Sequence, residues 1–66
     1  MEKEKGRCGN FRVFLVGKMA WEVRDKNSGQ TVAYATNMSG AFSQAEKLAM
    51  ADGSLFPKGN KFLGNQ

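Results

Sequence analysis

The chain has no histidine, one cysteine and one proline among its 66 residues. Without histidine it lacks the side chain that most often serves as a general base near neutral pH. A single cysteine excludes a disulfide within the chain, and one cysteine without histidine leaves too few ligands for a four-ligand zinc site. We therefore expect a non-enzymatic protein that uses no cofactor and no metal.

Long apolar runs are missing as well. No stretch of the sequence approaches the roughly 18 apolar residues of a transmembrane helix. Residues 1–7 lead into a strand-like pattern and not into the cleavable apolar segment of a signal peptide. A lone thiol is compatible with a reducing compartment. We expect a cytoplasmic protein that has no membrane partner.

The charge is unbalanced toward the positive. Ten Lys and Arg against six Asp and Glu give a net charge of +4. A basic balance favours polyanionic partners such as nucleic acid, or an acidic protein. Small domains also carry a net charge of about 2–8 for solubility alone, so composition leaves the choice open. A chain this short has a thin core, and self-association as a homodimer is one way to stabilise it.

Three segments have the composition or the alternation of β-strands. Residues 10–16 are rich in β-branched and aromatic side chains, and residues 20–25 alternate apolar with polar. The turn Lys26-Asn27-Ser28-Gly29 favours the positive φ of a tight hairpin, so residues 30–36 are predicted to form the third strand. We expect Arg24 to face Thr31, and a turn over residues 17–19 to set Val16 opposite Ala20 and Leu15 opposite Trp21. One apolar face then consists of Phe11, Val13, Leu15, Trp21, Val23, Val32 and Tyr34.

Residues 41–51 are dense in good helix formers. Asn37 or Ser39 is placed to cap the helix, and Gly53 is placed for a left-handed residue just after it. The fold class is therefore α+β, a three-stranded antiparallel sheet packed on one C-terminal helix. Residues 1–9 are predicted to be a flexible leader, residues 10–56 the single domain, and residues 57–66 a loosely ordered basic tail.

The second face of the predicted sheet carries the candidate binding site. Arg12 and Arg24 are cross-strand neighbours there, with Phe14 between them. Like charges that face each other across a strand pair are mildly destabilising, so a bound phosphate backbone would explain their presence. Glu22 on the same face could instead neutralise one of the arginines. The predicted nucleic-acid-binding residues are Arg12, Phe14, Lys18, Arg24, Lys26 and Thr31.

A strand W-x-V-R-D, a turn K-N-S-G, a third strand and an Ala-Glu-containing helix follow one another over residues 11–51. This order resembles the small sheet-plus-helix DNA-binding domains of the integrase arm-binding and AP2 type. The resemblance implies a three-stranded sheet laid in the DNA major groove. The residues that carry it are Trp21, Val23, Arg24, Asp25, Gly29, Ala45 and Ala49.

A protein-binding module is the alternative to nucleic-acid binding. Methionine and phenylalanine near a surface are favoured at adaptable interfaces, and an exposed strand can pair with a partner strand. Small inhibitors and adaptors, including those of phages and other mobile elements, are often of this size. Two further features allow two interpretations each. The thiol of Cys8, next to Arg7, is either reactive or ordinary, and Lys58 and Lys61 in the tail either add electrostatic binding or only increase solubility.

Overall fold

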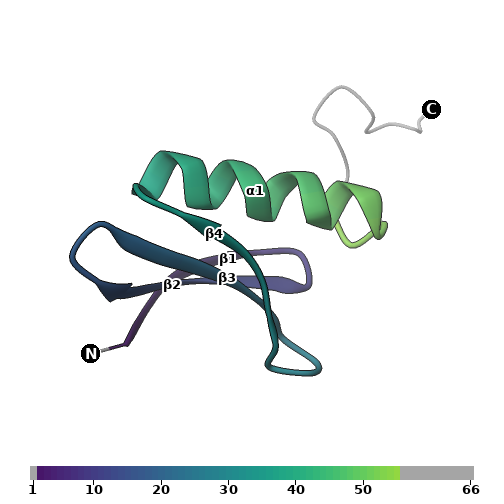
Figure 1. Ribbon diagram of the computed structural model, residues 1–66. Helices are drawn as coiled ribbons and strands as arrows, with labels where there is room; N and C mark the ends of the chain where they lie inside the picture. Colours follow the sequence, from purple (N-terminus) through teal and green to yellow (C-terminus); the bar gives the residue numbers. More distant parts are fainter. Residues whose placement is uncertain (1, 56–66) are drawn as a thin grey trace.

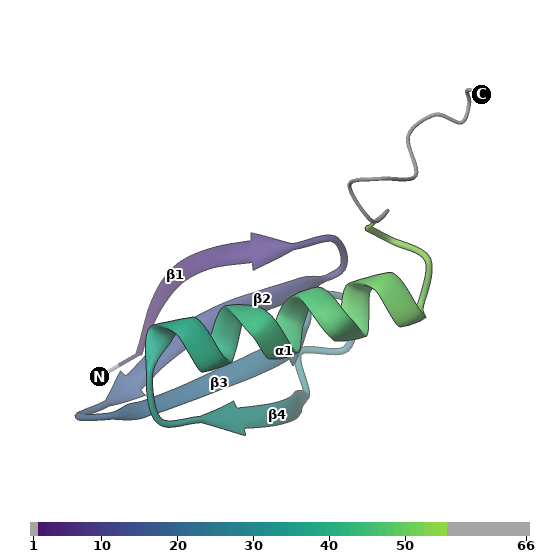
Figure 2. The same cartoon turned by 90° about the horizontal axis from the view of Figure 1, so that it is seen from above.

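The computed structural model describes residues 2–55, which form four strands and one helix. The strands are β1 (Lys3–Cys8), β2 (Phe11–Gly17), β3 (Ala20–Asp25) and β4 (Thr31–Ala35), and the helix is α1 (Met38–Ala51). The sheet is antiparallel with the order β1-β2-β3-β4, and α1 lies across one of its faces (Figures 1 and 2). The α+β class with one C-terminal helix is confirmed, but the sheet has four strands and not three.

The additional strand, β1, lies in the stretch that was predicted to be a flexible leader. Its sequence, KEKGRC, offers little apolar alternation, which is why the strand is hard to recognise. Gly6 faces the helix, and a Cβ at this position would lie 2.7 Å from Cζ of Phe42. The helix-facing site of β1 is therefore filled by an aromatic ring from α1, and a glycine is what makes room for it.

The β1–β2 turn is fastened to the end of the helix. Gly9 has a φ of +55°, a conformation that glycine adopts readily. The backbone N–H of Asn10 donates to Oγ of Ser54 at 2.9 Å, and its side-chain amide donates to Asp52 at 3.4 Å. These contacts join the β1–β2 turn to the segment that follows the helix.

The β2–β3 register agrees with the prediction except beside the turn, where a bulge at residue 16 pairs Gly17, and not Val16, with Ala20. Val13 pairs with Val23, Leu15 pairs with Trp21, and Arg12 pairs with Arg24. Val13 and Val23 are fully buried, and Trp21 is 9% exposed. These pairs form the centre of the core beneath the helix.

The β3–β4 register differs from the prediction beyond its first pair. Arg24 pairs with Thr31 as expected, but a bulge at residue 32 then places Val23 opposite Ala33 and Trp21 opposite Ala35. Val32 and Tyr34 are consequently 45% and 72% exposed instead of buried. Both had been placed on the apolar face, and this prediction is wrong.

The packing of α1 explains why Ala33 and Ala35 of β4 face the helix in place of Val32 and Tyr34. The fully buried side chains of α1 are Ala41, Ala45 and Ala49, spaced four residues apart along one stripe. A stripe of methyl groups lets the helix backbone approach the sheet closely, so Ala33 and Ala35 fit beneath it. Phe42, Leu48 and Leu55 pack around this stripe.

The helix ends follow local rules. The side chain of Asn37 accepts a hydrogen bond from the N–H of Gly40 at 2.7 Å, so Asn37 and not Ser39 is the N-cap. The helix begins at Met38, three residues before the predicted start. Asp52 is the C-cap and Gly53 follows with a φ of +83°, as predicted. Phe56 and the basic tail over 57–66 lie outside the described residues.

Candidate binding surfaces

The sheet face opposite α1 gathers charged residues around one aromatic ring. Alternation along β2 and β3 turns Arg12, Phe14, Glu22 and Arg24 away from the helix. Cζ of Arg24 lies 4.3 Å from the centroid of the Phe14 ring, and Cζ of Arg12 lies 5.4 Å from it. The sequence-predicted trio is therefore brought together, with both guanidinium groups against one phenyl ring.

Two carboxylates that were not predicted reach this face, from Glu4 on β1 and from Glu2 just before it. Glu4 accepts two hydrogen bonds from Arg12, from Nη2 at 2.6 Å and from Nε at 3.1 Å. Glu2 accepts two from Arg24, from Nη1 and Nη2, each at 2.9 Å. Bidentate pairs of this kind are the strongest form of the arginine–carboxylate interaction. These two ion pairs were not predicted, because the sequence of β1 does not indicate that it is a strand beside β2.

A third carboxylate completes the network. Glu22 accepts from Arg24 at 2.9 Å and 3.1 Å and from the hydroxyl of Thr31 at 2.8 Å. Arg7 adds a long contact to Glu4 at 3.6 Å. Three arginines and three glutamates thus share this face, and its formal net charge is zero. We call these six residues the arginine–glutamate network: Glu2, Glu4, Arg7, Arg12, Glu22 and Arg24.

Ion pairing shifts the pKa values of four members of the network, which are Glu2, Glu4, Arg12 and Arg24. Hydrogen bonds from Arg24 and Arg12 lower the pKa of Glu2 and of Glu4 below the ordinary value of 4.5. The pKa of Arg24 is raised by hydrogen bonds to Glu2 and Glu22, and that of Arg12 by its hydrogen bond to Glu4. All of these groups therefore stay charged and paired at neutral pH.

The remaining predicted site residues lie apart from this face. Lys18 is in the β2–β3 turn and Lys26 follows β3, and both are exposed. Neither forms an ion pair with any residue in the range 2–55. The structure therefore separates the six predicted residues into a neutralised cluster and two lysines at opposite ends of β3.

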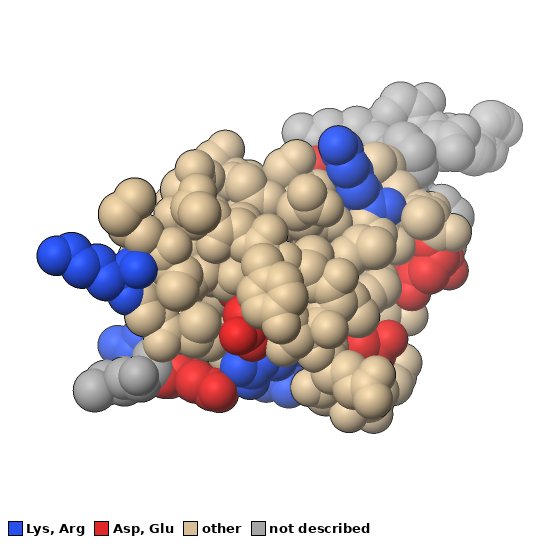
Figure 3. All heavy atoms as spheres, viewed as in Figure 1, with Lys and Arg blue, Asp and Glu red and all other residues tan. Residues whose placement is uncertain are grey.

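A second group of exposed residues is apolar and follows the chain along β4 into α1. Val32 and Tyr34 are on β4, where Tyr34 pairs with Glu22, and Met38 is the first residue of α1; they are 45%, 72% and 55% exposed. Sequence reasoning placed the first two in the core because the bulge cannot be read from the residues alone. Figure 3 looks onto the β4 side of the molecule and shows mainly uncharged surface there, with most Lys, Arg, Asp and Glu near the margins.

Two other candidates have simpler roles. Cys8 packs against the core, and burial raises the pKa of its thiol, with a smaller effect in the same direction from Glu46. A raised pKa keeps the thiol protonated, contrary to activation by the neighbouring Arg7. Within residues 2–55 no three His, Cys, Asp or Glu side chains gather as metal ligands. No helix in that range is long and apolar enough to cross a bilayer.

Comparison with protein-family models, with curated proteins and with solved structures gave no match. The resemblance to integrase arm-binding and AP2-type domains therefore rests only on the residues quoted for it.

Proposed function

We propose that this chain is a protein-binding module that holds an extended strand of its partner along β4. The observation that carries the proposal is the composition of this edge. All five residues of β4 are uncharged, and three of the five most exposed large apolar side chains of residues 2–55 are Val32, Tyr34 and Met38. An edge strand offers unpaired backbone N–H and C=O groups to a partner strand. Main-chain hydrogen bonds would supply affinity, and the exposed side chains would select the partner.

The apolar side chains support this function over a merely solvated edge. Natural edge strands are commonly protected by charged residues, and lysine above all. β4 has none over residues 31–35, although a bulge at residue 32 interrupts its pairing with β3. An exposed edge without charge, with another exposed apolar residue three positions further along at the start of α1, is typical of an interaction surface.

The test compares two double variants, each of which replaces two exposed apolar side chains by lysine, one on β4 and one elsewhere on the surface. V32K/Y34K places charge on β4, whereas M19K/M50K replaces two exposed apolar residues elsewhere. Each protein is used to capture partners from extracts of the cells that encode it. We expect a partner that the wild type and M19K/M50K capture and that V32K/Y34K does not. Its affinity for V32K/Y34K should be at least ~10-fold lower than for the wild type, or about 1.4 kcal/mol.

The captured partner is then examined by amide hydrogen exchange. Pairing along β4 should slow exchange in residues 31–35, because their backbone groups become hydrogen-bonded. A partner that binds V32K/Y34K as tightly as the wild type, or that protects only other strands, would contradict the proposal. Both variants must first show a cooperative unfolding transition.

Nucleic-acid binding is the second candidate, and the free lysines favour it. The net charge of +4 is not carried by the arginine–glutamate network, whose charges cancel. Lys18 and Lys26 have no carboxylate partner within residues 2–55 and are free to meet phosphates. Arg12 and Arg24 could do so only by exchanging their carboxylate partners for phosphates.

Titration into labelled duplex and single-stranded DNA and RNA tests this candidate at ~50 mM and ~200 mM salt, where phosphate-driven binding falls steeply. If the lysines bind phosphate, K18Q/K26Q weakens binding and flattens its salt dependence. If the arginine face binds phosphate, R12Q/R24Q has the larger effect. Absence of binding at the lower salt would exclude nucleic acid as the partner.

A further inference from the structure

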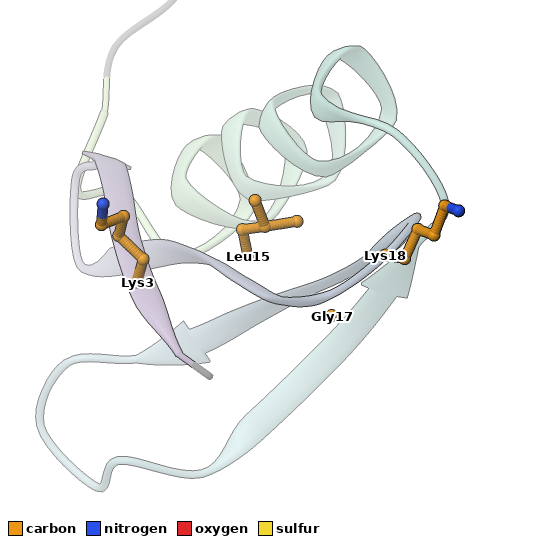
Figure 4. Close-up of a pocket in the computed structure, with 4 residues that line it drawn as sticks. All are labelled: Lys3, Leu15, Gly17 and Lys18. Atoms are coloured by element: carbon orange, nitrogen blue, oxygen red, sulfur yellow. The ribbon is translucent and has the colours of Figure 1, made fainter.

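The end of the molecule at which β1 begins and β2 ends is hollowed. Lys3, Leu15, Gly17 and Lys18 line an open hollow of about 320 Å³. Figure 4 shows Leu15 directed toward α1, with Lys3 on one side and Lys18 on the other. A volume of this size lies at the lower end of the roughly 300–1,000 Å³ range of small-molecule sites.

The lining combines an apolar floor with two cationic walls. Leu15 is only partly buried, although it pairs with Trp21 and packs against the core. Lys3 is opposite Leu15 on β1, and Lys18 is in the β2–β3 turn. Neither lysine forms an ion pair with any carboxylate of residues 2–55, unlike the three arginines of the same part of the chain.

Two further features give this end a positive potential and an apolar rim. α1 begins at the same end of the molecule as the β2–β3 turn and has no acidic residue in its first turn (Figures 1 and 2). The positive end of the helix dipole is therefore not neutralised from within the helix. Met19, next to Lys18, has a φ of +55° and is 70% exposed. A non-glycine residue in this conformation is strained, and strain of this kind is frequent at ligand-binding turns.

We infer that this hollow binds a small carboxylate with an apolar body, such as a medium-chain or aryl carboxylic acid. The apolar part would lie on Leu15. The ammonium groups of Lys3 and Lys18 lie on opposite sides of the hollow and are turned away from Leu15 (Figure 4), so both side chains would swing inward to meet the carboxylate. Charge complementarity selects an anion, and the apolar floor selects against small hydrated anions. This site is independent of the proposed β4 surface, because its strands are β1 and β2 at the opposite edge of the sheet.

Octanoate is the probe, and Trp21 is the reporter. Trp21 is the only tryptophan of the chain and pairs with Leu15, so occupation of the hollow should change its fluorescence. We expect saturable binding in the millimolar range that weakens as salt is raised, because the lysines are exposed. 1-Octanol, which has the same chain without the charge, should bind several-fold more weakly.

The variant K3Q/K18Q removes both cations from the hollow without touching the core. It should weaken octanoate binding about five- to tenfold, the effect expected of two exposed ion pairs. K26Q/K47Q removes the same charge from exposed positions elsewhere and should leave the affinity within about twofold. Equal loss in both double variants, equal affinity for octanol and octanoate, or no saturable fluorescence change in the wild type would each overturn the inference.

Discussion

The two edge strands of the sheet, β1 and β4, are equally exposed by topology but differ in their side chains. β1 carries Lys3, Lys5 and Arg7, whereas β4 carries no charge at all. Each strand has a bulge in its pairing with the neighbouring strand, so irregular pairing alone does not distinguish them. Charge does, because a lysine-rich edge resists pairing with another strand. The β1 edge is therefore protected against pairing with another strand, whereas the β4 edge is not.

The two edge strands also differ in the contacts that hold them to the rest of the molecule. β1 is held by the Gly9 turn, by the helix end and by the arginine–glutamate network. β4 is held by its pairing with β3 and by the Asn37 cap that leads into the helix. Variants at these points test whether the two edges differ in stability as their contacts suggest.

The largest expected effect is at the β1–β2 turn. In Gly9→Ala a Cβ would lie 2.9 Å from Cβ of Ala49 and would also meet Ser54, on a backbone with a φ of +55°. We expect a loss of about 2–4 kcal/mol in the free energy of unfolding, since steric overlap adds to backbone strain. Urea unfolding followed by Trp21 fluorescence measures it.

Gly29→Ala is the matched control in the β3–β4 hairpin. Its φ is +76°, but a Cβ there would have nothing within 4 Å. Only backbone strain remains, so the loss should be about 1 kcal/mol. Equal losses at the two glycines would show that close packing at the β1 turn contributes nothing.

A smaller effect is expected where β4 joins the helix. Asn37→Ala removes the side-chain oxygen that accepts from Gly40 and should lower the unfolding free energy by about 1 kcal/mol. Ser39→Ala, at the other residue considered for the cap, is the control and should change it by less than about 0.5 kcal/mol. A reversal of this order in urea unfolding would contradict the assigned cap.

The pH dependence of stability tests the network that ties β1 to the sheet. The lowered pKa values of Glu2 and Glu4 mean that the folded state holds these protons less tightly than the unfolded state. Their contribution is present above the ordinary value of 4.5 and is lost as the pH falls through the lowered values.

Replacement of both carboxylates in E2Q/E4Q should lower stability at neutral pH and flatten the fall below about pH 4.5. Asp52, whose pKa is lowered by hydrogen bonds from Ser54, retains part of that fall. Urea midpoints at about pH 7 and about pH 3 measure the change. A variant that loses as much stability between these values as the wild type would show that the pairs do not stabilise the fold.

The smallest effect concerns the protection of β1 itself. Lys5→Thr removes a charge from this edge and supplies a residue with higher strand propensity. Sedimentation velocity at high protein concentration should detect a slight increase in self-association that Lys47→Thr, on the exposed side of α1, does not produce. Equal behaviour of the two variants would mean that charge at Lys5 does not protect the edge.

The accuracy of the sequence-based predictions follows the range of the interactions concerned. The pairing of Arg12 with Arg24 around Phe14 was predicted because alternation and a short turn set the register of β2 and β3. Glu2 and Glu4, which neutralise those arginines, were missed because β1, which brings both to the sheet, has no apolar pattern. A Gly9-Asn10 pair is a known hairpin signal, but the prediction ends the leader at Gly9 and begins the first strand at Asn10, so this turn is missed.

The sequence by itself determined the two central strands, the helix and its C-terminal glycine, because local alternation, propensity and capping decide them. It also determined that two arginines would flank Phe14. That residues 3–8 pair as a strand depends on the tertiary structure. The ring of Phe42 on α1 occupies the space that a side chain at Gly6 would need, and this contact cannot be read from the local sequence. Only the tertiary structure likewise decided that Val32 and Tyr34 face solvent. The alanine stripe of α1 approaches the sheet too closely for large side chains, and the bulge in β4 places Ala33 and Ala35 beneath it.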